Sequence, residues 1–403
     1  MPGYGHRYWA ERTSAARRRT YPVVGTDGTA DVVVIGGGLT GATAAYVFAS
    51  AGLDVVLAEG ERLADAATAG GLGALVPDPA ASYRDVAAAA GHRAARTAWQ
   101  ESRRGMLDMA AAIRRLPARR DLAAVALMIN ARDRDAAAIA SKEQAARKSA
   151  DLDASWLAPA RARAEVGTES AGAIRLRAAF VHDPVRTTLA LAAAAVEKGA
   201  RIHERSPVRR TTFTRTEAAV VTPGGTIRAR HVFVATGAPG RLFGQLRRHV
   251  HERDAWVVVT ESLSPAMRRE TGPRTAVLAE AGADPHWLRW LPENRAMFAG
   301  AVSTPVGPRL LDRTLVQRTG QLMYELSVRY PIISGLPARW SWRVPLTLTG
   351  DGLPWIGPHR NYPFHFFAMA FGWHGDALAW TAAKAALGHF TGAGRREDRV
   401  FWR

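Results

Sequence analysis

The feature that most constrains this chain is a strand, a glycine turn and a helix close to its start. Asp31–Ile35 is a short β-branched run typical of a buried parallel strand, and Leu39–Ser50 is an alanine-rich helix that ends at Gly52. Asp54–Ala58 predicts a second strand. A β-α-β unit in this order indicates an α/β fold with a parallel sheet.

The turn of this unit reads GGGLTG at positions 36–41 and fits the G-x-G-x-x-G pattern. Gly36 permits a tight turn, Gly38 lets a pyrophosphate approach the backbone, and Gly41 lets the helix pack closely on the strand. A strand, this turn and a helix in this order predict a bound dinucleotide.

Three further residues of the unit fit a dinucleotide. Leu39 and Thr40 begin the helix, whose free N–H groups and dipole favour a phosphate. Glu59 ends the second strand, and its carboxylate has two acceptor oxygens for the two hydroxyls of an adenosine ribose. These residues do not separate NAD from FAD.

The formal net charge of +18 raises the question of a nucleic-acid partner. Nearly all of the positive charge comes from arginines scattered along the chain, and the lysines are confined to Lys142, Lys148, Lys198 and Lys384. This pattern favours a generally basic surface over a dedicated polyanion site, so we expect no nucleic-acid partner.

The sequence contains no cysteine, which excludes disulfides, thiolate metal sites, cysteine nucleophiles and cofactor bonds through cysteine. His249 and His251 have the spacing of two metal ligands on one strand. No third ligand is evident near them, and the flanking arginines would repel a cation. We therefore expect no metal.

Residues 1–30 lack the apolar core of a signal peptide. Val32–Gly52 is weakly charged and resembles a membrane span, but its glycines and the strand that follows favour the β-α-β unit. We expect a cytoplasmic protein without a membrane span.

The rest of the chain predicts two hydrophobic cores, since 47% of 403 residues are hydrophobic. Strands with hairpin signals from residue 255 onward predict an antiparallel sheet. Helices are predicted at Arg93–Leu116, Arg132–Lys148, Pro184–Lys198, Leu311–Tyr330 and Ala377–Phe390. Further strands are predicted at Leu122–Ile129, Arg201–His203, Arg230–Ala235, Trp256–Thr260, Trp287–Leu291 and Ala296–Ala299.

Several long stretches follow one another in a recognisable order. They are HRYWAE, DVVVIGGGLTGATAAYVFASAGLDVVLAEGERL, PVRTTLALAAAAVEKGARIHERSPV, RHVFVATGAPG, TGDGLPWIGPH and FFAMAFGWHGDALA. The second resembles the N-terminal FAD segment of the D-amino-acid oxidase, glycine oxidase and sarcosine oxidase superfamily, and the first resembles the leader of its γ-glutamylputrescine oxidase-like members. The resemblance spans nearly the whole chain.

The resemblance implies that FAD is bound, either non-covalently or at most through a histidine. It also implies a fold class, α/β, in which a Rossmann-type FAD-binding domain is interleaved with an α+β substrate domain built on an antiparallel sheet. We expect the FAD-binding domain at 25–90, 150–245 and 340–403, the substrate-binding domain at 91–149 and 246–339, and a solvated leader at 1–24.

The resemblance also implies which residues contact the cofactor. Val208 falls where the family has a strand that touches the adenine, and Gly237 falls where the chain closely approaches the dinucleotide. Asp351 belongs to a loop that reaches the flavin. The segment with Gly372, Trp373 and Gly375 leads into a helix whose N–H groups would face the flavin N1 and C2 carbonyl.

The sequence departs from the family at three points. Thr68 is a predicted contact, but the segment 68–71 lacks the Arg and Asn that often follow there. Asp376 would oppose negative charge on reduced flavin unless it caps its own helix. No lysine resembles the one that activates oxygen in sarcosine oxidases, so oxidase and dehydrogenase both stay open.

Three residues are candidates for catalysis. Arg289 and Arg343 carry guanidinium groups that bind a carboxylate as a fork, although each also fits a surface ion pair. His374 either orients substrate and stabilises reduced flavin, or bonds to the loop backbone. Four tryptophans either form an aromatic wall for an amine or belong to a core: Trp340, Trp342, Trp355 and Trp373.

These observations predict FAD-dependent oxidation of the C–N bond of a small-molecule amine or amino acid. Hydride passes to flavin N5, the imine hydrolyses, and oxygen is the expected electron acceptor. Two alternatives share part of the pattern: an NAD-dependent dehydrogenase, and a flavoenzyme that acts on a modified base of RNA.

Overall fold

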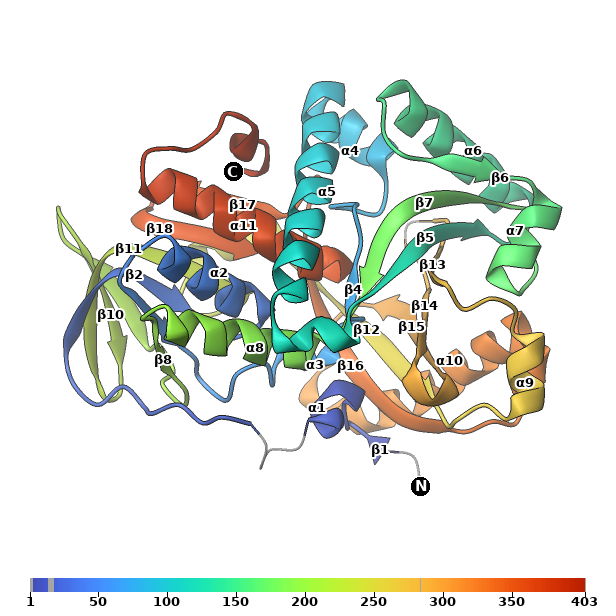
Figure 1. Cartoon of the computed structure of the whole chain (residues 1–403), viewed down its shortest axis with the longest axis horizontal. Helices are drawn as coiled ribbons and strands as arrows, with labels where there is room; N and C mark the ends of the chain where they lie inside the picture. Colours follow the sequence, from blue (N-terminus) through green and yellow to red (C-terminus); the bar gives the residue numbers. More distant parts are fainter. Residues whose placement is uncertain (1–2, 14–17, 283, 403) are drawn as a thin grey trace.

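Two β-sheets of different kinds organise the chain in the computed structural model, which describes residues 3–13, 18–282 and 284–402 (Figure 1). The smaller sheet has eight strands, and five of them pair in parallel in the order β18-β11-β2-β3-β8. Its strands are β2 (Gly28–Ile35), β3 (Val55–Ala58), β8 (Arg201–His203), β9 (Arg210–Phe213), β10 (Ala218–Thr222), β11 (Gly225–Gly237), β17 (Trp355–His359) and β18 (Tyr362–Met369).

Three helices cover one face of this parallel sheet. They are α2 (Leu39–Ser50), α8 (Pro184–Glu197) and α11 (Gly375–Phe390), and α2 packs between the other two. Because α2 has neighbours on both flanks and the sheet beneath it, it is apolar on nearly every side rather than amphipathic. Gly38 occupies the N-cap position of this helix and has no side chain to form a capping hydrogen bond.

The larger sheet has ten strands and is mainly antiparallel. Helix α10 (Leu311–Arg329) lies against β12, β15 and β16 and buries Leu315, Leu322 and Leu326. The strands are β1 (Gly3–Tyr4), β4 (Ala74–Leu75), β5 (Ala123–Ala131), β6 (Ser155–Leu157), β7 (Gly172–Val181), β12 (Val250–Thr260), β13 (Ala276–Glu280), β14 (Trp287–Leu291), β15 (Arg295–Ser303) and β16 (Ala338–Thr349).

Helices α5 (His92–Arg114) and α11 pack against each other where the two sheets meet. Short helices α3 (Ala67–Gly70) and α4 (Tyr83–Ala90) flank this region, and α6 (Arg134–Ser149) covers β5 and β7. The chain therefore crosses between the sheets several times. The predicted fold class, α/β with a parallel-sheet unit interleaved with an antiparallel one, is confirmed.

Most predicted elements are present. Helix α2 has the predicted bounds, and α5, α6, α8, α10 and α11 shift by one or two residues at their ends. Strand β7 was not predicted, because Arg175 and Arg177 interrupt its apolar run. Sheet membership also crosses the predicted boundaries at 150 and 340, since β7 and β16 both belong to the larger sheet. The division into domains stays a prediction.

The described part of the leader is not solvated throughout, contrary to expectation. Residues Tyr8–Arg12 form a short helix, α1, whose Tyr8 and Trp9 are buried in the core of the larger sheet. The Trp9 indole donates a hydrogen bond to the Gly71 carbonyl (2.9 Å), and Arg7 donates to the Ala66 carbonyl (2.9 Å). The leader thus fastens the segment around α3. Residues 1–2 and 14–17 lie outside the described part.

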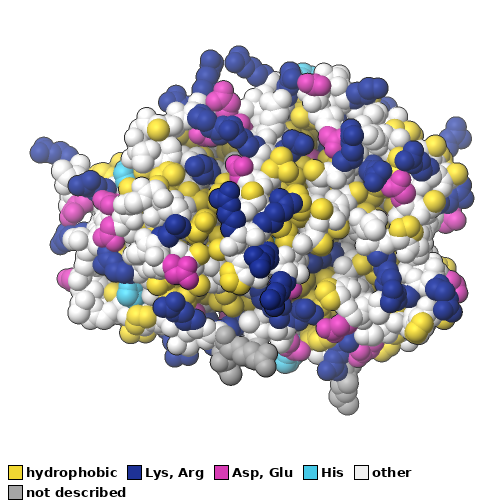
Figure 2. All heavy atoms as spheres, viewed as in Figure 1, with side chains coloured by type: hydrophobic (Ala, Val, Ile, Leu, Met, Phe, Trp, Pro, Cys, Tyr) yellow, Lys and Arg dark blue, Asp and Glu magenta, His cyan; other side chains and the backbone are white. Residues whose placement is uncertain are grey.

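Lysine and arginine side chains are spread over the visible face of the molecule (Figure 2). A group of them lies over the end of α5 and the following 3-10 helix η2 (Pro117–Asp121), where Arg114, Arg115, Arg119 and Arg120 are exposed. Within the described ranges, no helix combines the length and apolar character needed to cross a membrane.

A buried histidine makes the stability of this fold sensitive to acid. His365 of β18 lies among Phe243, Tyr362 and Phe367, and neither ring nitrogen has a hydrogen-bond partner in the described part of the chain. Burial lowers the pKa of His365 to about 4. The folded protein therefore resists the protonation that the unfolded chain undergoes near pH 6.5, and stability is lost as the pH falls from 6.5 towards 4.

We predict that His365→Phe removes part of this acid loss, since a phenyl ring fits an aromatic cluster and does not titrate. Between pH 7.5 and pH 5, urea titrations should show the wild type losing about 2 kcal/mol more unfolding free energy than the variant. Equal losses in the two proteins would show that His365 does not contribute.

Candidate active site

A cavity of about 550 Å³ lies at the carboxyl ends of β2, β3 and β11, the usual ligand position in a parallel sheet. The larger sheet closes it on another side through residues 344–347 of β16 and Glu252 of β12. The predicted contact residues that line it are Gly36, Gly38, Leu39, Thr40, Glu59, Thr68, Val208, Gly237, Gly372, Trp373 and Gly375. Gly41 and Asp351 do not.

The glycine turn explains why Gly41 lies outside the lining. Gly36 has a φ of +107°, a conformation that favours glycine. A Cβ atom on Gly41 would lie 1.8 Å from the Gly36 carbonyl oxygen, so this glycine lets α2 pack against the turn. A Cβ on Gly38 would meet only the Thr68 hydroxyl, at 3.0 Å. The backbone at Gly38 is therefore open to the cavity.

Side chains hold the turn from two directions. The Thr68 hydroxyl accepts a hydrogen bond from the Leu39 N–H (2.9 Å), which fixes α3 against the start of α2. The Glu59 carboxylate accepts from the backbone N–H groups of Gly37 (2.5 Å) and Glu61 (2.8 Å). Each carboxylate oxygen keeps a further lone pair, so Glu59 still has acceptors for a ligand in the cavity.

Two of the residues implied by the family resemblance have a different local structure. Val208 lines the cavity, but from the loop between β8 and β9 rather than from a strand. The Asp351 carboxylate accepts hydrogen bonds from the Thr349 hydroxyl (2.9 Å) and the Leu353 N–H (3.1 Å). Asp351 therefore shapes its own turn, and the sequence did not reveal this local role.

Asp376, at the start of α11, lines the cavity and is paired rather than free. Its Oδ2 lies 3.0 Å from Nε2 of His182, and Nδ1 of His182 lies 2.9 Å from the Thr187 hydroxyl. His182 is fully buried. Sequence reasoning missed His182, because it follows the unpredicted strand β7 and has no motif around it.

A second cavity of about 250 Å³ lies between α4, α6 and the strands β5, β13 and β14. The two cavities adjoin at the 3-10 helix η7 (Gly372–His374), because Trp373 lines the first and His374 lines the second. The His374 ring is buried and meets Trp287 edge-on, with centroids 5.8 Å apart. Burial lowers the pKa of His374, so the ring is neutral at pH 7.

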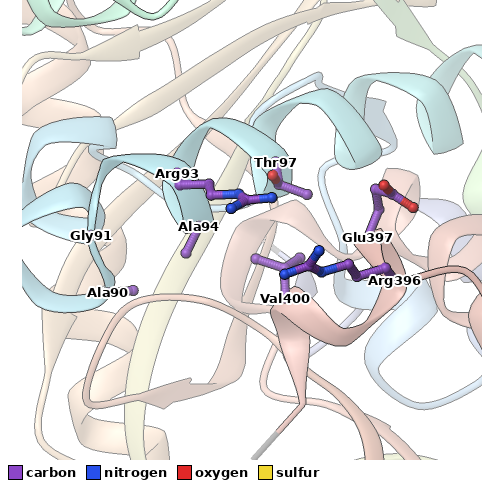
Figure 3. Close-up of a pocket in the computed structure, with 8 residues that line it drawn as sticks. All are labelled: Ala90, Gly91, Arg93, Ala94, Thr97, Arg396, Glu397 and Val400. Atoms are coloured by element: carbon purple, nitrogen blue, oxygen red, sulfur yellow. The ribbon is translucent and has the colours of Figure 1, made fainter.

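Another hollow, of about 340 Å³, lies between the start of α5 and the 3-10 helix η8 (Glu397–Phe401). Figure 3 shows Arg93 and Thr97 of α5 across from Arg396 and Glu397. Its charged side chains are exposed to solvent, and it contains none of the predicted site residues. We therefore place the chemistry in the two adjoining cavities.

The described residues contain no group of three or more His, Asp or Glu side chains placed to hold a metal ion. His249 packs against the rings of Trp355 and His359, with centroids 5.3 and 6.0 Å apart.

Comparison with known proteins identifies the family. The model of a family described as FAD dependent oxidoreductase matches residues 31–387. The chain belongs to this family. The predicted superfamily, enzyme class and cofactor, FAD, are confirmed, and the NAD-dependent alternative is not supported.

Individual relatives are more distant. The chain is 23% identical to the gamma-glutamylputrescine oxidoreductase of Escherichia coli (strain K12), over 99% of this chain and 92% of that protein. The glycine oxidase of Geobacillus kaustophilus shares the fold with a TM-score of 0.73 and 18% identity, over 91% and 96% of the two chains. An L-amino acid deaminase from Proteus myxofaciens has the same TM-score at 16% identity, over 99% and 98%.

In this FAD-dependent oxidoreductase, the three catalytic candidates lie apart from one another. Only His374 lines one of the two cavities. Nη1 of Arg343 lies 3.4 Å from the buried carboxylate of Asp254 and donates to the Val306 carbonyl (3.3 Å). Arg343 is therefore an ion-pair partner outside the cavities, which is the alternative that the sequence left open.

Arg289 is buried and is not among the residues that line either cavity. Its Nη1 donates to the carbonyls of Leu72 (2.7 Å), Gly73 (2.6 Å) and His182 (2.9 Å), and its guanidinium lies 4.8 Å from the centre of the Trp9 ring. Burial lowers the pKa of Arg289 to about 10, so it stays charged at pH 7. It ties β14 to the segments before β4 and after β7.

The predicted tryptophans divide between core and cavity. Trp342 and Trp355 are fully buried, and the Trp342 indole donates to the Gly70 carbonyl (3.1 Å). Trp340 packs edge-on against Tyr8, with centroids 5.3 Å apart. Trp373 lines the larger cavity, so the four do not form one aromatic wall.

We predict that Arg289→Met destabilises the protein by about 3 kcal/mol or more, because three buried carbonyls lose their donor. The midpoint of thermal unfolding should fall by on the order of 4 °C. Arg289→Lys keeps a cation with three donors and should restore part of the loss. A variant with unchanged stability and only a raised KM would instead return Arg289 to the role of carboxylate anchor.

Proposed function

We propose that the larger cavity binds FAD non-covalently and that the smaller cavity binds an amine or amino acid, whose C–N bond the enzyme oxidises. One observation carries this proposal. The predicted cofactor contacts, Gly41 and Asp351 apart, line one cavity, and the consecutive residues Trp373 and His374 join it to the second. No cysteine or histidine is among the described residues that line the larger cavity.

The chain's own groups divide the work along the larger cavity. The open backbone at Gly38 and the start of α2 receive the pyrophosphate, and Glu59 accepts the ribose hydroxyls. The start of α11 directs N–H groups to the other end, where negative charge develops. The Asp376 carboxylate opposes that charge. The contact of its Oδ2 with His182 Nε2 reduces this opposition.

FAD supplies a two-electron acceptor that takes a hydride from the carbon bearing the amine. The nitrogen lone pair forms the C=N bond as that C–H bond breaks, and water then converts the imine to a carbonyl compound and ammonia or an amine. Oxygen takes up the two electrons with two protons as hydrogen peroxide. Because burial lowers the pKa of His374, its neutral ring is available for a hydrogen bond with the substrate nitrogen, which reacts as the free amine.

The relatives support this reaction class through their names. Glycine oxidase and L-amino acid deaminase act on amino acids, and gamma-glutamylputrescine oxidoreductase acts on an amine derivative.

We predict that Glu59→Gln weakens FAD binding by about 10- to 100-fold, because one charge-assisted acceptor becomes an amide donor that faces a backbone N–H. Fluorescence titration of the apoprotein with FAD measures the dissociation constant. Glu61→Gln removes the same charge from an exposed neighbour and should leave FAD binding within about twofold. Equal dissociation constants for Glu59→Gln and the wild type would remove Glu59 from the site.

The reaction itself is tested by mixing the FAD-loaded protein with amines and with D-, L- and N-methyl amino acids under anaerobic conditions. We expect at least one of these compounds to bleach the flavin absorbance, and oxygen to restore it with release of hydrogen peroxide. Flavin that binds but is reduced by none of them would overturn the proposed function. Bleached flavin that oxygen fails to restore would overturn only the proposed electron acceptor.

A further inference from the structure

Three buried polar atoms around the smaller cavity have no hydrogen-bond partner in the described part of the chain. They are Oδ1 of Asp78, Nδ1 of His374 and Nε1 of Trp287, and all three residues line the cavity. The side chains are 3%, 8% and 3% exposed. Because unpaired buried polar atoms cost free energy, three of them around one cavity indicate a place for a polar ligand group.

Asp78 is held in place by a buried network. Its Oδ2 accepts a hydrogen bond from Nη1 of Arg147 (2.7 Å), whose Nε donates to Oε1 of Glu143 (2.7 Å). The two oxygens of Glu143 also accept from the backbone N–H groups of Tyr83 (2.7 Å) and Arg84 (3.1 Å). The network positions Asp78 firmly and leaves its Oδ1, in a residue that lines the cavity, as the oxygen without a hydrogen-bond partner.

No cation lines the buried end of this cavity. Arg147 is fully buried, lies 5.7 Å from the centre of the Trp99 ring and is not among the lining residues. The lining contains four carboxylates and a single guanidinium, that of Arg84, which is exposed at the solvent side. The carboxylates are those of Asp78, Asp85, Glu143 and Glu280; outside the lining, Arg147 pairs with Asp78 and Glu143, and Arg329 pairs with Glu280.

This charge distribution disfavours an α-amino acid. The carboxylate of such a substrate is attached to the reacting carbon, so it would enter the buried end beside Asp78 without a cation to receive it. An amine instead donates an N–H to the free Asp78 oxygen. Its chain then follows an apolar wall formed by Leu127, Ile129, Ile139, Ala140 and Ile174.

We propose that Asp78 anchors the reacting nitrogen of the substrate and that the substrate is an aliphatic amine with no carboxylate on the reacting carbon. The proposal rests on the proposed function and names the substrate class for the same site. The exposed carboxylate of Asp85, at the solvent side, favours a second cationic group at the far end of the substrate.

The first test compares substrates that differ only by the carboxylate. The FAD-loaded enzyme is mixed anaerobically with butylamine or with D- or L-norvaline, which carries a carboxylate on the carbon that bears its single amine. We expect butylamine to bleach the flavin about 100-fold faster than either norvaline at equal concentration. Norvaline that reduces the flavin as fast as butylamine would overturn the inference, and amine and amino-acid oxidation would still stand.

The second test measures binding without reaction. Tert-butylamine has no hydrogen on the carbon that bears its nitrogen, so it cannot be oxidised, and pivalate is its carboxylate counterpart. We expect tert-butylamine to perturb the spectrum of the oxidised flavin at concentrations about tenfold lower than pivalate. Tighter binding of pivalate would overturn the inference even if no compound reduced the flavin, which separates this failure from that of the proposed function.

The third test uses variants. Asp78→Asn keeps the shape and the acceptor for Arg147 but presents an amide donor to the cavity, so amine binding should weaken by about 10- to 100-fold. Asp312→Asn removes the same charge from an exposed position on α10 and should leave amine binding unchanged.

Asp85→Asn provides a second test if Asp78→Asn does not fold. Asp85 is also exposed, and its replacement should weaken the binding of 1,4-diaminobutane, a diamine, about threefold. Unchanged amine binding in a folded Asp78→Asn variant would overturn the inference, as would unchanged diamine binding in Asp85→Asn.

Discussion

The contact between the Arg289 guanidinium and three backbone carbonyls holds the centre of this molecule together. The arginine comes from the larger sheet, and the carbonyls of Leu72, Gly73 and His182 lie on two crossings between the sheets. His182 in turn meets Asp376 at the start of α11. A single buried cation thus connects the larger sheet, through His182, to the helix end that lines the larger cavity.

The two cavities share one short wall but have opposite chemical character. The larger one is bounded by open backbone and by the starts of α2 and α11, which favour anions such as phosphate. The smaller one is lined by carboxylates and apolar side chains, which favour a cation on a hydrocarbon chain. The consecutive residues Trp373 and His374 line the larger and the smaller cavity respectively, so the two cavities meet at this short segment.

Much of this arrangement could be predicted from the sequence because it depends on local pattern. The β-α-β unit, Glu59 and the segment 372–375 are contiguous motifs, and the structure brings them to one cavity. The roles of Arg289, Arg343 and His182 could not be predicted, because an isolated arginine or histidine looks the same whether it meets a substrate, a carboxylate or a carbonyl. The Asp78 network could not be predicted for a similar reason, because Asp78 and Arg147 lie 69 residues apart in the sequence.

The buried leader has a consequence for how this fold is reached. Trp9 touches the Gly71 carbonyl and the Arg289 guanidinium, and Tyr8 packs on Trp340, so a helix near one end of the sequence completes contacts with partners hundreds of residues away. During synthesis, the contacts of Trp9 with Arg289 and of Tyr8 with Trp340 can form only after β14 and β16 have emerged, so the leader reaches its final packing after most of the chain has been made.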